Sequence, residues 1–213
     1  MQFDLFDETA NAVLGTPTYA AFRERLLASN CQRCPLGGTR TNIVVDRGNP
    51  DRPILVIGEG PGENEDLQGK AFVGRAGVLL DKILGAIGLD TNRDMLIANV
   101  VKCRVPENLP PSAESVEQCL PYLRKQIELV RPRIVLLLGS TALKHLDPTR
   151  RLGPMSEEAG RFFTLGTYPL VEFMVLYHPA ALLYNARLKS DMWAHVKILQ
   201  RRLREMDLLP GSA

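Results

Sequence analysis

The four cysteines of the chain are spaced in a way that could bind a metal. Cys31 and Cys34 form a C-x2-C pair, and fifteen residues separate Cys103 from Cys119. The close pair can hold one metal centre with both thiolates, and the two later thiolates complete a four-thiolate set. Zinc and an iron–sulfur cluster both accept such a set, and the loose second pair favours a cluster without excluding zinc. Ordinary buried thiols remain the other interpretation.

A glycine-rich, acidic segment over residues 58–66 could line a ligand pocket. It reads Gly-Glu-Gly-Pro-Gly-Glu-Asn-Glu-Asp and directly follows an apolar run. Its third glycine comes one position too early for a dinucleotide-binding loop, and Gly69-Lys70 is followed by Ala71 where a phosphate-binding loop needs Ser or Thr. The segment is therefore either an acidic surface turn or a pocket floor. In a pocket, its carboxylates could hold a water or stabilise a developing cation.

Two ring side chains, Phe72 and His178, could also do chemistry. Phe72 stands between glycines, where a phenylalanine is usually part of the core but can also stack on a planar ligand. His178 follows an apolar run and precedes Pro179, which stiffens the turn. A lone histidine is as often structural as functional. Its position opposite the glycine-rich segment in the expected fold favours a functional role, whereas His145 and His195 fall on predicted helices.

Apolar patterns predict the elements that must position these residues. Buried strands are expected over 53–58, 95–101, 133–139 and 171–177, and helices over 16–28, 76–87, 112–130 and 190–204. Thr16 and Pro17 should begin the first helix, and Pro121 should kink or interrupt the third. Strands that alternate with helices indicate a parallel sheet covered on both faces. Ligands of such sheets bind beyond the carboxyl ends of the strands, where the candidate residues lie.

Composition sets the broad class. The 213 residues suit one domain over residues 1–213, with 1–15 and 206–213 as peripheral tails. Hydrophobic residues make up 45% and charged residues 23%, as in a globular protein, and no apolar run is long enough for a membrane helix. The first residues lack the pattern of a secretory signal, so a soluble intracellular protein is expected. A formal charge of +2 neither requires nor excludes a nucleic acid partner.

Together these motifs resemble those of the family 4 uracil-DNA glycosylases, the iron–sulfur type of bacteria and archaea. The resemblance extends over about residues 31–189. Its motifs, in order, are Cys31-x2-Cys34-x-Leu36, Thr39-Arg40-Thr41, Gly58-Glu59-Gly60-Pro61-Gly62-x2-Glu65-Asp66, Phe72-Val73-Gly74-x-Ala76-Gly77, Asn99, Cys103, Cys119 and His178-Pro179-Ala180. Each motif is weak alone, and their order on alternating strands and helices is specific.

The resemblance implies a fold, a cofactor and an activity. The fold would be α/β, a three-layer αβα arrangement with a central four-stranded parallel sheet. Cys31, Cys34, Cys103 and Cys119 would ligate a structural [4Fe–4S] cluster. The enzyme would be a monofunctional glycosylase that hydrolyses the N-glycosidic bond of deoxyuridine in single- or double-stranded DNA and leaves an abasic site for base excision repair. We expect a monomer in a bacterial or archaeal cytoplasm, associated with the nucleoid and not with a membrane.

The resemblance also implies residue roles. Phe72 would stack on a flipped-out uracil, and the Asn99 amide would pair with uracil O4 and N3–H but not with cytosine. His178 and backbone N–H groups near Gly60 would stabilise negative charge on uracil O2. Glu59 and Glu65 are the candidates to stabilise the oxocarbenium-like sugar or to orient water.

DNA contacts are expected after the His-Pro-Ala motif. Leu182 or Leu183 could fill the gap that the flipped base leaves, and Arg187 and Lys189 could contact phosphates. The chain departs from the family at Gly60, where Ala is commoner, at Ala71 in place of Pro, and at Tyr184 in place of Arg. The last departure leaves the role of residue 184 open.

Two other classes compete with the glycosylase. One is a DNA-binding module that keeps the cluster without the chemistry. It would retain the cysteines but lose Asn99 or His178, and both are present. The other is a redox protein, which would need a flavin or nicotinamide loop that the sequence does not contain. A related subgroup that traps the abasic product through a histidine is disfavoured, because residues 104–118 contain no histidine.

Overall fold

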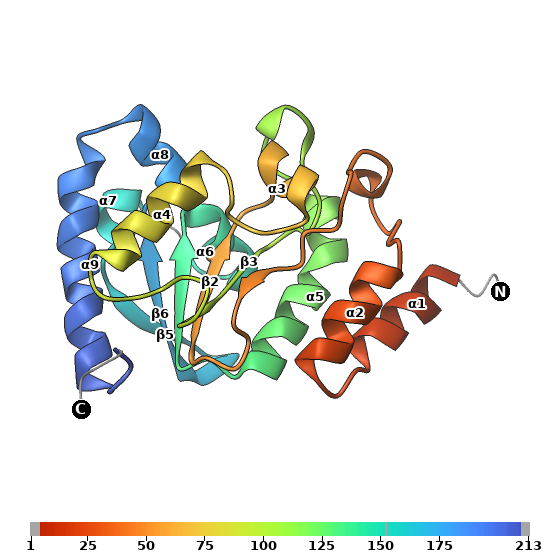
Figure 1. Cartoon of the computed structure of the whole chain (residues 1–213), viewed down its shortest axis with the longest axis horizontal. Coiled ribbons are helices and arrows are strands. Elements are labelled where there is room, and N and C mark those ends of the chain that lie inside the picture. Colours follow the sequence, from red (N-terminus) through yellow and green to blue (C-terminus); the bar gives the residue numbers. More distant parts are fainter. Residues whose placement is uncertain (1–4, 152, 210–213) are drawn as a thin grey trace.

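A six-stranded sheet forms the centre of the molecule. The computed structural model describes residues 5–151 and 153–209. The strands are β1 (Arg47–Gly48), β2 (Ile54–Gly58), β3 (Leu96–Asn99), β4 (Ile134–Leu138), β5 (Phe162–Leu165) and β6 (Tyr168–Leu176). They are ordered β1-β3-β2-β4-β6-β5 across the sheet (Figure 1). The four middle strands run parallel, and each edge strand is antiparallel to its neighbour.

The four parallel strands are those that the sequence predicts, and the two edge strands are not. Every residue of β2, β3 and β4 is buried, which is why these strands read as continuous apolar runs. β1 has only two residues, and β5 is mostly half exposed with an irregular register against β6, so neither has such a run. The α/β class is confirmed, and the expected four-stranded parallel sheet is the centre of a six-stranded mixed sheet.

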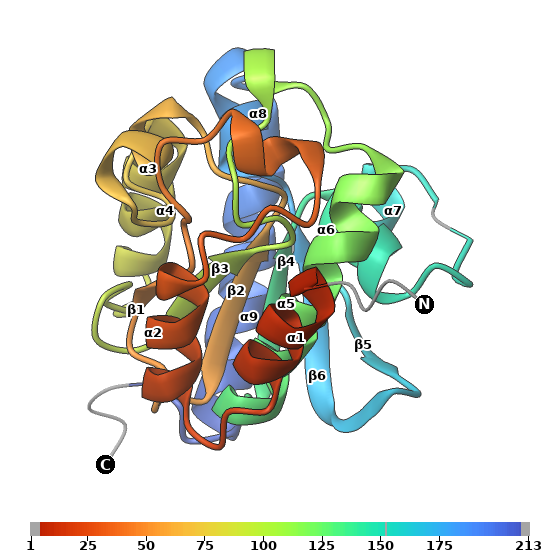
Figure 2. The ribbon, with the colours of Figure 1, turned by 90° about the vertical axis from the view of Figure 1, so that its right-hand side faces the viewer.

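Helices cover both faces of this sheet, which gives three layers (Figures 1 and 2). Apolar side chains on one face pack against α1 (Leu5–Leu14), α2 (Tyr19–Ala28), α5 (Ala113–Val130) and α6 (Ser140–Leu146). The other face packs against α4 (Arg75–Gly85), α8 (Pro179–Tyr184) and α9 (Leu188–Glu205). Short helices α3 (Glu63–Gln68) and α7 (Met155–Glu158) and 3-10 turns over Pro35–Gly38 and Pro106–Asn108 complete the chain. The αβα arrangement is therefore observed.

The amino-terminal region differs most from the sequence prediction. Residues 1–15 were expected to be a tail, but α1 occupies most of them and contacts α2 and α5. Thr16 does not begin the next helix, because its hydroxyl donates to the Val13 carbonyl at 2.8 Å. Thr18 is the N-cap instead and accepts the Ala21 N–H at 3.3 Å. At the other end, Leu208 and Leu209 pack against the core, and residues 210–213 of the expected tail lie outside the described residues.

The remaining helices begin and end near their predicted positions. α5 runs without interruption through Pro121, where a break was expected, and its N-cap Ser112 accepts the Ser115 N–H at 3.1 Å. α4 begins one residue before the prediction, and α9 begins at Leu188 rather than at residue 190. In the described ranges, no helix is both long and apolar enough to cross a membrane.

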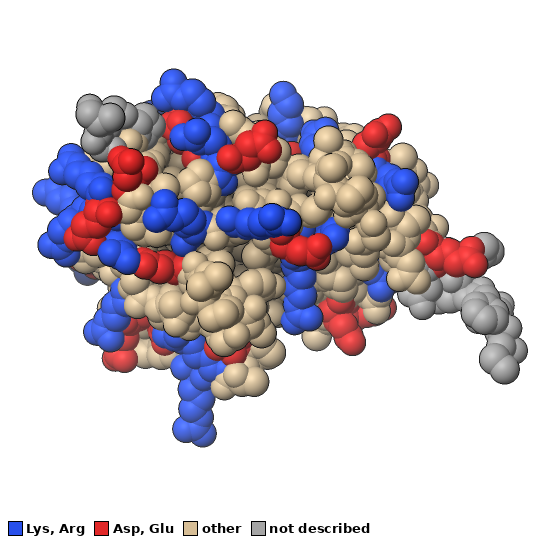
Figure 3. Space-filling view, turned by 90° about the horizontal axis from the view of Figure 1, so that it is seen from below, with Lys and Arg blue, Asp and Glu red and all other residues tan. Residues whose placement is uncertain are grey.

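The two ends of the parallel strands differ in what surrounds them. The carboxyl ends lead into α3, the residue 100–112 segment, α6 and α8, and α3 and α8 lie at the top of Figure 1. On the face seen from below, lysines and arginines alternate with acidic side chains (Figure 3). The candidate residues lie at the carboxyl ends, as sheets of this kind predict.

Candidate active site

A cleft of about 700 Å³ opens at the carboxyl ends of the parallel strands. Six residues that the sequence singles out line it together: Glu59, Gly60, Glu65, Phe72, Asn99 and His178. Its outer wall comes from Val105, Leu109 and Pro111 of the segment after β3 and from Leu183 and Tyr184 of α8. Arg104 pairs with Glu63 of α3 at 3.4 Å and thereby joins two walls of the cleft.

Asn99 ends β3 and carries the clearest sign of a ligand. The residue is 1% exposed, and among the described residues neither its Oδ1 nor its Nδ2 has a hydrogen-bond partner. Leaving a buried polar group unpaired costs about 1–3 kcal/mol, so native structures seldom do it without a reason. A Cβ on Gly58 would lie 2.5 Å from Asn99 Oδ1 and 2.5 Å from the Phe72 ring. Glycine at 58 therefore leaves room for the amide and the ring side by side.

Phe72 is held against the cleft by an unusual backbone. Its φ of 55° is left-handed, which costs a non-glycine residue on the order of 1–3 kcal/mol. Gly77 allows this turn, because a side chain there would collide with the Phe72 carbonyl. The ring is 5% exposed, and its centroid lies 5.8 Å from that of His178. The two rings therefore form one corner of the cleft.

His178 is the N-cap of α8, and its capping hydrogen bond determines which ring nitrogen carries the proton. Its Nδ1 accepts the Ala180 N–H at 3.2 Å, so in the neutral ring the proton is on Nε2. Burial lowers the pKa of His178, although the charges of Glu59 and Glu65 oppose that shift. The ring is therefore a neutral N–H donor near pH 7.

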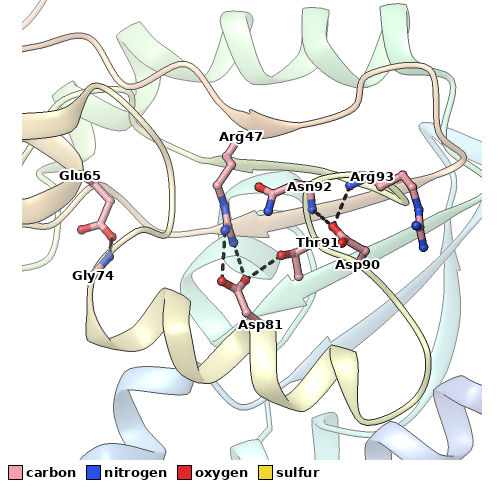
Figure 4. Close-up of polar contacts among 8 residues, drawn as sticks. All are labelled: Arg47, Glu65, Gly74, Asp81, Asp90, Thr91, Asn92 and Arg93. Carbon is pink, nitrogen blue, oxygen red and sulfur yellow. Dashed lines mark hydrogen bonds and ion pairs between the residues drawn. The ribbon is translucent and has the colours of Figure 1, made fainter.

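The carboxylates of the glycine-rich segment differ in their contacts. Glu65 Oε1 accepts the Gly74 N–H at 2.6 Å and so ties α3 to the loop that carries Phe72 (Figure 4). Glu59 is half-buried on the cleft wall. Asp66 is 2% exposed and accepts the backbone N–H groups of Thr41 and Asn42 at 2.9–3.1 Å. Of the two predicted carboxylates, Glu65 thus has a structural contact of its own.

An ion pair between Arg47 of β1 and Asp81 holds helix α4 against the sheet. Arg47 contacts Asp81 at 2.6 and 3.2 Å, and Thr91 donates to the same carboxylate at 2.7 Å (Figure 4). Such a bidentate contact fixes the helix that follows the Phe72 loop.

The departure from the family at Gly60 also has a local cause, because a Cβ there would lie 2.9 Å from Val101 Cγ2.

The residues expected to contact DNA separate into two groups. Leu182 is 2% exposed and packs in the core, so it cannot insert into a duplex from this position. Leu183 is 38% exposed on the cleft wall, and Tyr184 is 90% exposed beside it. Arg187 and Lys189 are exposed where α9 begins. The prediction for Leu182 is therefore wrong, and its neighbours on α8 face outward instead.

The four cysteines line a second, much smaller cavity of about 20 Å³. Cys119 Sγ accepts the Lys102 backbone N–H at 3.2 Å, and Arg40 Nη1 lies 3.7 Å from Cys103 Sγ. The Tyr122 hydroxyl lies 3.7 Å from Cys31 Sγ. Burial raises the pKa of Cys103 to about 11 and that of Cys119 to about 12. Over the described ranges, no group of three or more His, Cys, Asp or Glu side chains is placed to hold a metal ion.

Comparison with known proteins gives consistent matches. The profile of the uracil DNA glycosylase superfamily matches residues 45–200. A type-4 uracil-DNA glycosylase of Saccharolobus solfataricus is 40% identical over 75% of this chain and 76% of its own length. One of Thermotoga maritima is 40% identical over 73% of this chain and 79% of its own. A type-5 uracil-DNA glycosylase of Pyrobaculum aerophilum is 31% identical over 84% and 90%.

Proposed function

Because this chain belongs to the uracil DNA glycosylase superfamily and is a uracil-DNA glycosylase of DNA repair, we propose that its cleft takes up a flipped-out deoxyuridine. Hydrolysis of the N-glycosidic bond would release uracil and leave an abasic site for base excision repair. The observation that carries this proposal is the buried, unpaired amide of Asn99 beside the rings of Phe72 and His178. An enzyme that acts on a base must first take it out of the stack.

We propose that Asn99 reads the base. Its Nδ2 donates to uracil O4, and its Oδ1 accepts from uracil N3–H. Cytosine presents a donor and an acceptor in the reverse places, so it would leave both amide atoms unpaired in a buried site. Sites built to form hydrogen bonds discriminate strongly for this reason. Phe72 stacks on the ring and fixes its plane.

His178 is the proposed electrostatic partner of the departing base. As the C1′–N1 bond breaks, negative charge develops on uracil O2. The Nε2–H of a neutral His178 can donate to that oxygen, and the backbone N–H groups near Gly60 can assist, as in an oxyanion hole. The Ala180 contact matters here, because it keeps Nδ1 an acceptor and so directs the proton to Nε2.

Of the two candidate carboxylates, we assign Glu59 to the reacting sugar and Glu65 mainly to positioning. A carboxylate near the oxocarbenium-like sugar lowers the barrier and can orient the attacking water. Glu59 lines the cleft. Glu65 also lines it, but one of its oxygens already holds Gly74. Its negative charge still contributes to the field at the site.

We propose that Cys31, Cys34, Cys103 and Cys119 hold a [4Fe–4S] cluster. The donor set fits this group, because four thiols line one cavity. N–H and hydroxyl groups of Lys102, Arg40 and Tyr122 surround three of the sulfurs, as the partners of cluster-bound thiolates do. The cluster would join the residue 31–34 loop, the end of β3 and α5, and it would take no electron in the reaction. Iron and sulfide analysis tests this, and zinc in a colourless protein would overturn it.

We further propose that uracil-containing DNA, single- or double-stranded, is bound by a monomer in a bacterial or archaeal cytoplasm, near the nucleoid. Leu183 and Tyr184 would enter the gap that the base leaves, and Arg187 and Lys189 would contact phosphates. Leu183 and Tyr184 line the cleft, and Arg187 and Lys189 are exposed in the segment that follows α8, which supports these roles.

The test is release of free uracil from an oligonucleotide that contains one deoxyuridine. The expected product is an alkali-labile abasic site at that position, with a thymine or cytosine oligonucleotide left intact. An iron-loaded protein that binds the oligonucleotide without releasing uracil would instead be a DNA-binding module. The same assay on Asn99→Ala shows whether the proposed amide carries the activity.

A further inference from the structure

A second hollow adjoins the cleft and is not used by the proposed chemistry. It has a volume of about 490 Å³ and shares Asn64, Gly74, Arg75 and Leu183 with the cleft. Its own lining adds Gln68, Val73, Val78, Leu79 and Lys82. We call this hollow the α4 groove. It is continuous with the cleft, and Leu183 belongs to the wall of both.

The side chains of the α4 groove match a nucleic acid strand. Arg75 and Lys82 are exposed, and no ion pair involving either occurs in the described part of the chain. They are seven residues apart on α4, so they share a face and are separated by about 10 Å along the helix. That separation equals about three nucleotide steps measured along the axis of a B-form duplex, at 3.4 Å per step of one strand. Val78, 49% exposed, lies between them and offers an apolar contact to a sugar or base.

We propose that the α4 groove binds the uracil-bearing strand on one side of the flipped nucleotide, with Arg75 and Lys82 as phosphate contacts. This inference rests on the proposed function. It places the strand over α4, so that the base turns into the cleft at Leu183. On the described surface of the opposite end, cations alternate with acidic side chains (Figure 3).

The experiment compares the double variant Arg75→Gln/Lys82→Gln with wild type in uracil release. Removing two phosphate contacts should raise KM at least tenfold and flatten the dependence of log(kcat/KM) on log[salt] by about 1.8, at about 0.9 per contact. The matched control is Arg201→Gln on the far part of α9, which should behave as wild type. Inhibition by free uracil should be unchanged, because the double variant leaves Phe72, Asn99 and His178, the residues proposed to contact the base, in place.

Two shortened substrates locate the contact. Each lacks the nucleotides on one side of the deoxyuridine, and one of them should abolish the difference between double variant and wild type. The proposal that the α4 groove binds the strand is overturned by either of two results. One is a double variant whose kcat/KM depends on salt as that of wild type does, and the other is a difference in KM that remains with both shortened substrates. Failure of the wild-type enzyme to release uracil would instead overturn the proposed function, so the two failures are distinguishable.

A separate, buried observation concerns Lys102. The residue is 1% exposed, and its Nζ donates to the Asn99 carbonyl at 2.6 Å and to Gln126 Oε1 at 2.5 Å. Gln126 in turn donates to Tyr19 at 2.8 Å. The Lys102 backbone N–H reaches Cys119 Sγ at 3.2 Å. One residue thus contacts the backbone of the proposed base reader and a sulfur of the cysteine cavity.

The geometry points to Lys102 as a positioning residue for base recognition. The Asn99 amide has no hydrogen bond of its own within the described residues, so its position depends on the packing around it and on the backbone that carries it, which is paired with Gly58 in the sheet. The ammonium of Lys102 fixes that backbone by its carbonyl. Burying an ammonium is costly, and it is tolerated here because both contacts are charge-assisted.

A double-mutant cycle tests this role. Lys102→Met should lower kcat/KM for uracil release at least tenfold in the wild type but less than threefold in the Asn99→Ala background, with iron content unchanged in both. Lys102→Arg, which can keep the contacts, should restore most of the activity. Equal losses in the two backgrounds would show a merely structural role. If Lys102→Met does not fold, Gln126→Leu replaces it in the cycle, because this change removes one acceptor of the Lys102 ammonium. The same comparison of losses then separates a positioning role from a structural one.

Discussion

The cleft and the cavity lined by the four cysteines both take lining residues from the segment 99–103, and their polar groups differ in whether they have partners. In the open cleft, Asn99 has two buried amide atoms without partners in the described structure. In the small cavity, the sulfurs of Cys119, Cys103 and Cys31 each have a neighbouring N–H or hydroxyl group. Under the proposed function, the unpaired amide of the cleft is kept for a ligand that binds and leaves. The partnered sulfurs of the cavity would hold a permanently bound group.

This difference separates stability from activity. A residue that is unpaired in the free protein contributes little to folding, so its loss should be felt in the reaction. A residue that helps to hold a permanent group contributes to folding, so its loss should be felt first in stability. Substitutions in the two regions can therefore be told apart by measuring both quantities on each variant.

The largest effect is expected in the cysteine cavity. Cys103→Ala removes one proposed ligand, so the protein should lose its iron and its brown absorbance. Loss of a metal site is among the few single changes that cost several kcal/mol. At about 3 kcal/mol or more, the melting temperature should fall by roughly 6–12 °C for a chain of this size. Iron analysis and thermal unfolding measure both. A variant that keeps full iron content would remove Cys103 from the ligand set.

In the cleft, Asn99→Ala should do the reverse. The single-turnover rate of uracil release should fall about 100- to 1000-fold, the effect of losing one well-placed donor from a catalytic site. The free energy of unfolding should stay the same or rise by up to about 3 kcal/mol, because the amide that is removed was buried and unpaired. Iron content serves as the control. A rate near that of wild type would place the base reader elsewhere.

How far the sequence predicted this arrangement depends on the physical signal at each position. The parallel strands were predicted because buried strands read as apolar runs, and parallel strands bring their carboxyl ends to one edge. Because Glu59, Asn99 and His178 each lie at or just after the carboxyl end of a predicted strand, the sequence predicts that they meet in one cleft. The edge strands β1 and β5 were missed, because their pairing depends on the neighbouring strand and not on their own short sequences.

Other misses concern orientation and partners, which a sequence does not display. The sequence suggests Leu182 or Leu183 as the inserting residue, but it does not show which side of α8 faces the core, and Leu182 is the residue on that side. Lys102 was overlooked because its role comes from Gln126 and the Asn99 carbonyl, which only the fold brings to it. The sequence does carry one sign that Lys102 is buried, since this lysine directly follows the apolar residues Val100 and Val101.

A smaller effect should separate the two roles of Glu65. Glu65→Gln keeps an oxygen to accept the Gly74 N–H, whereas Glu65→Ala does not. If the residue acts mainly by holding the Phe72 loop, the glutamine variant should keep the rate of uracil release within about fivefold and the alanine variant should lose more. The two rates and the two melting temperatures decide this. Equal losses in both variants would show that the charge itself is needed, as we propose for Glu59.

The smallest expected effect is the pH dependence of stability that comes from His178. Burial lowers the pKa of its folded state below the ordinary value of about 6.5, so below that pH the unfolded chain binds a proton that the folded chain refuses. Stability contributed by this residue therefore falls as the pH falls from about 6.5 toward the folded pKa, by at most about 1.4 kcal/mol per pH unit.

His178→Gln removes that contribution, so its melting temperature relative to wild type should rise as the pH is lowered from 7 to about 5.5. His145→Gln is a comparison variant: burial also lowers the pKa of His145, so its melting temperature relative to wild type should rise in the same direction as the pH falls. Each variant is compared with wild type at every pH, so the other histidines cancel. If the difference in melting temperature between His178→Gln and wild type does not change with pH, the His178 ring is fully hydrated in the cleft. The argument that His178 is a neutral donor at Nε2 near pH 7 would then lose its support.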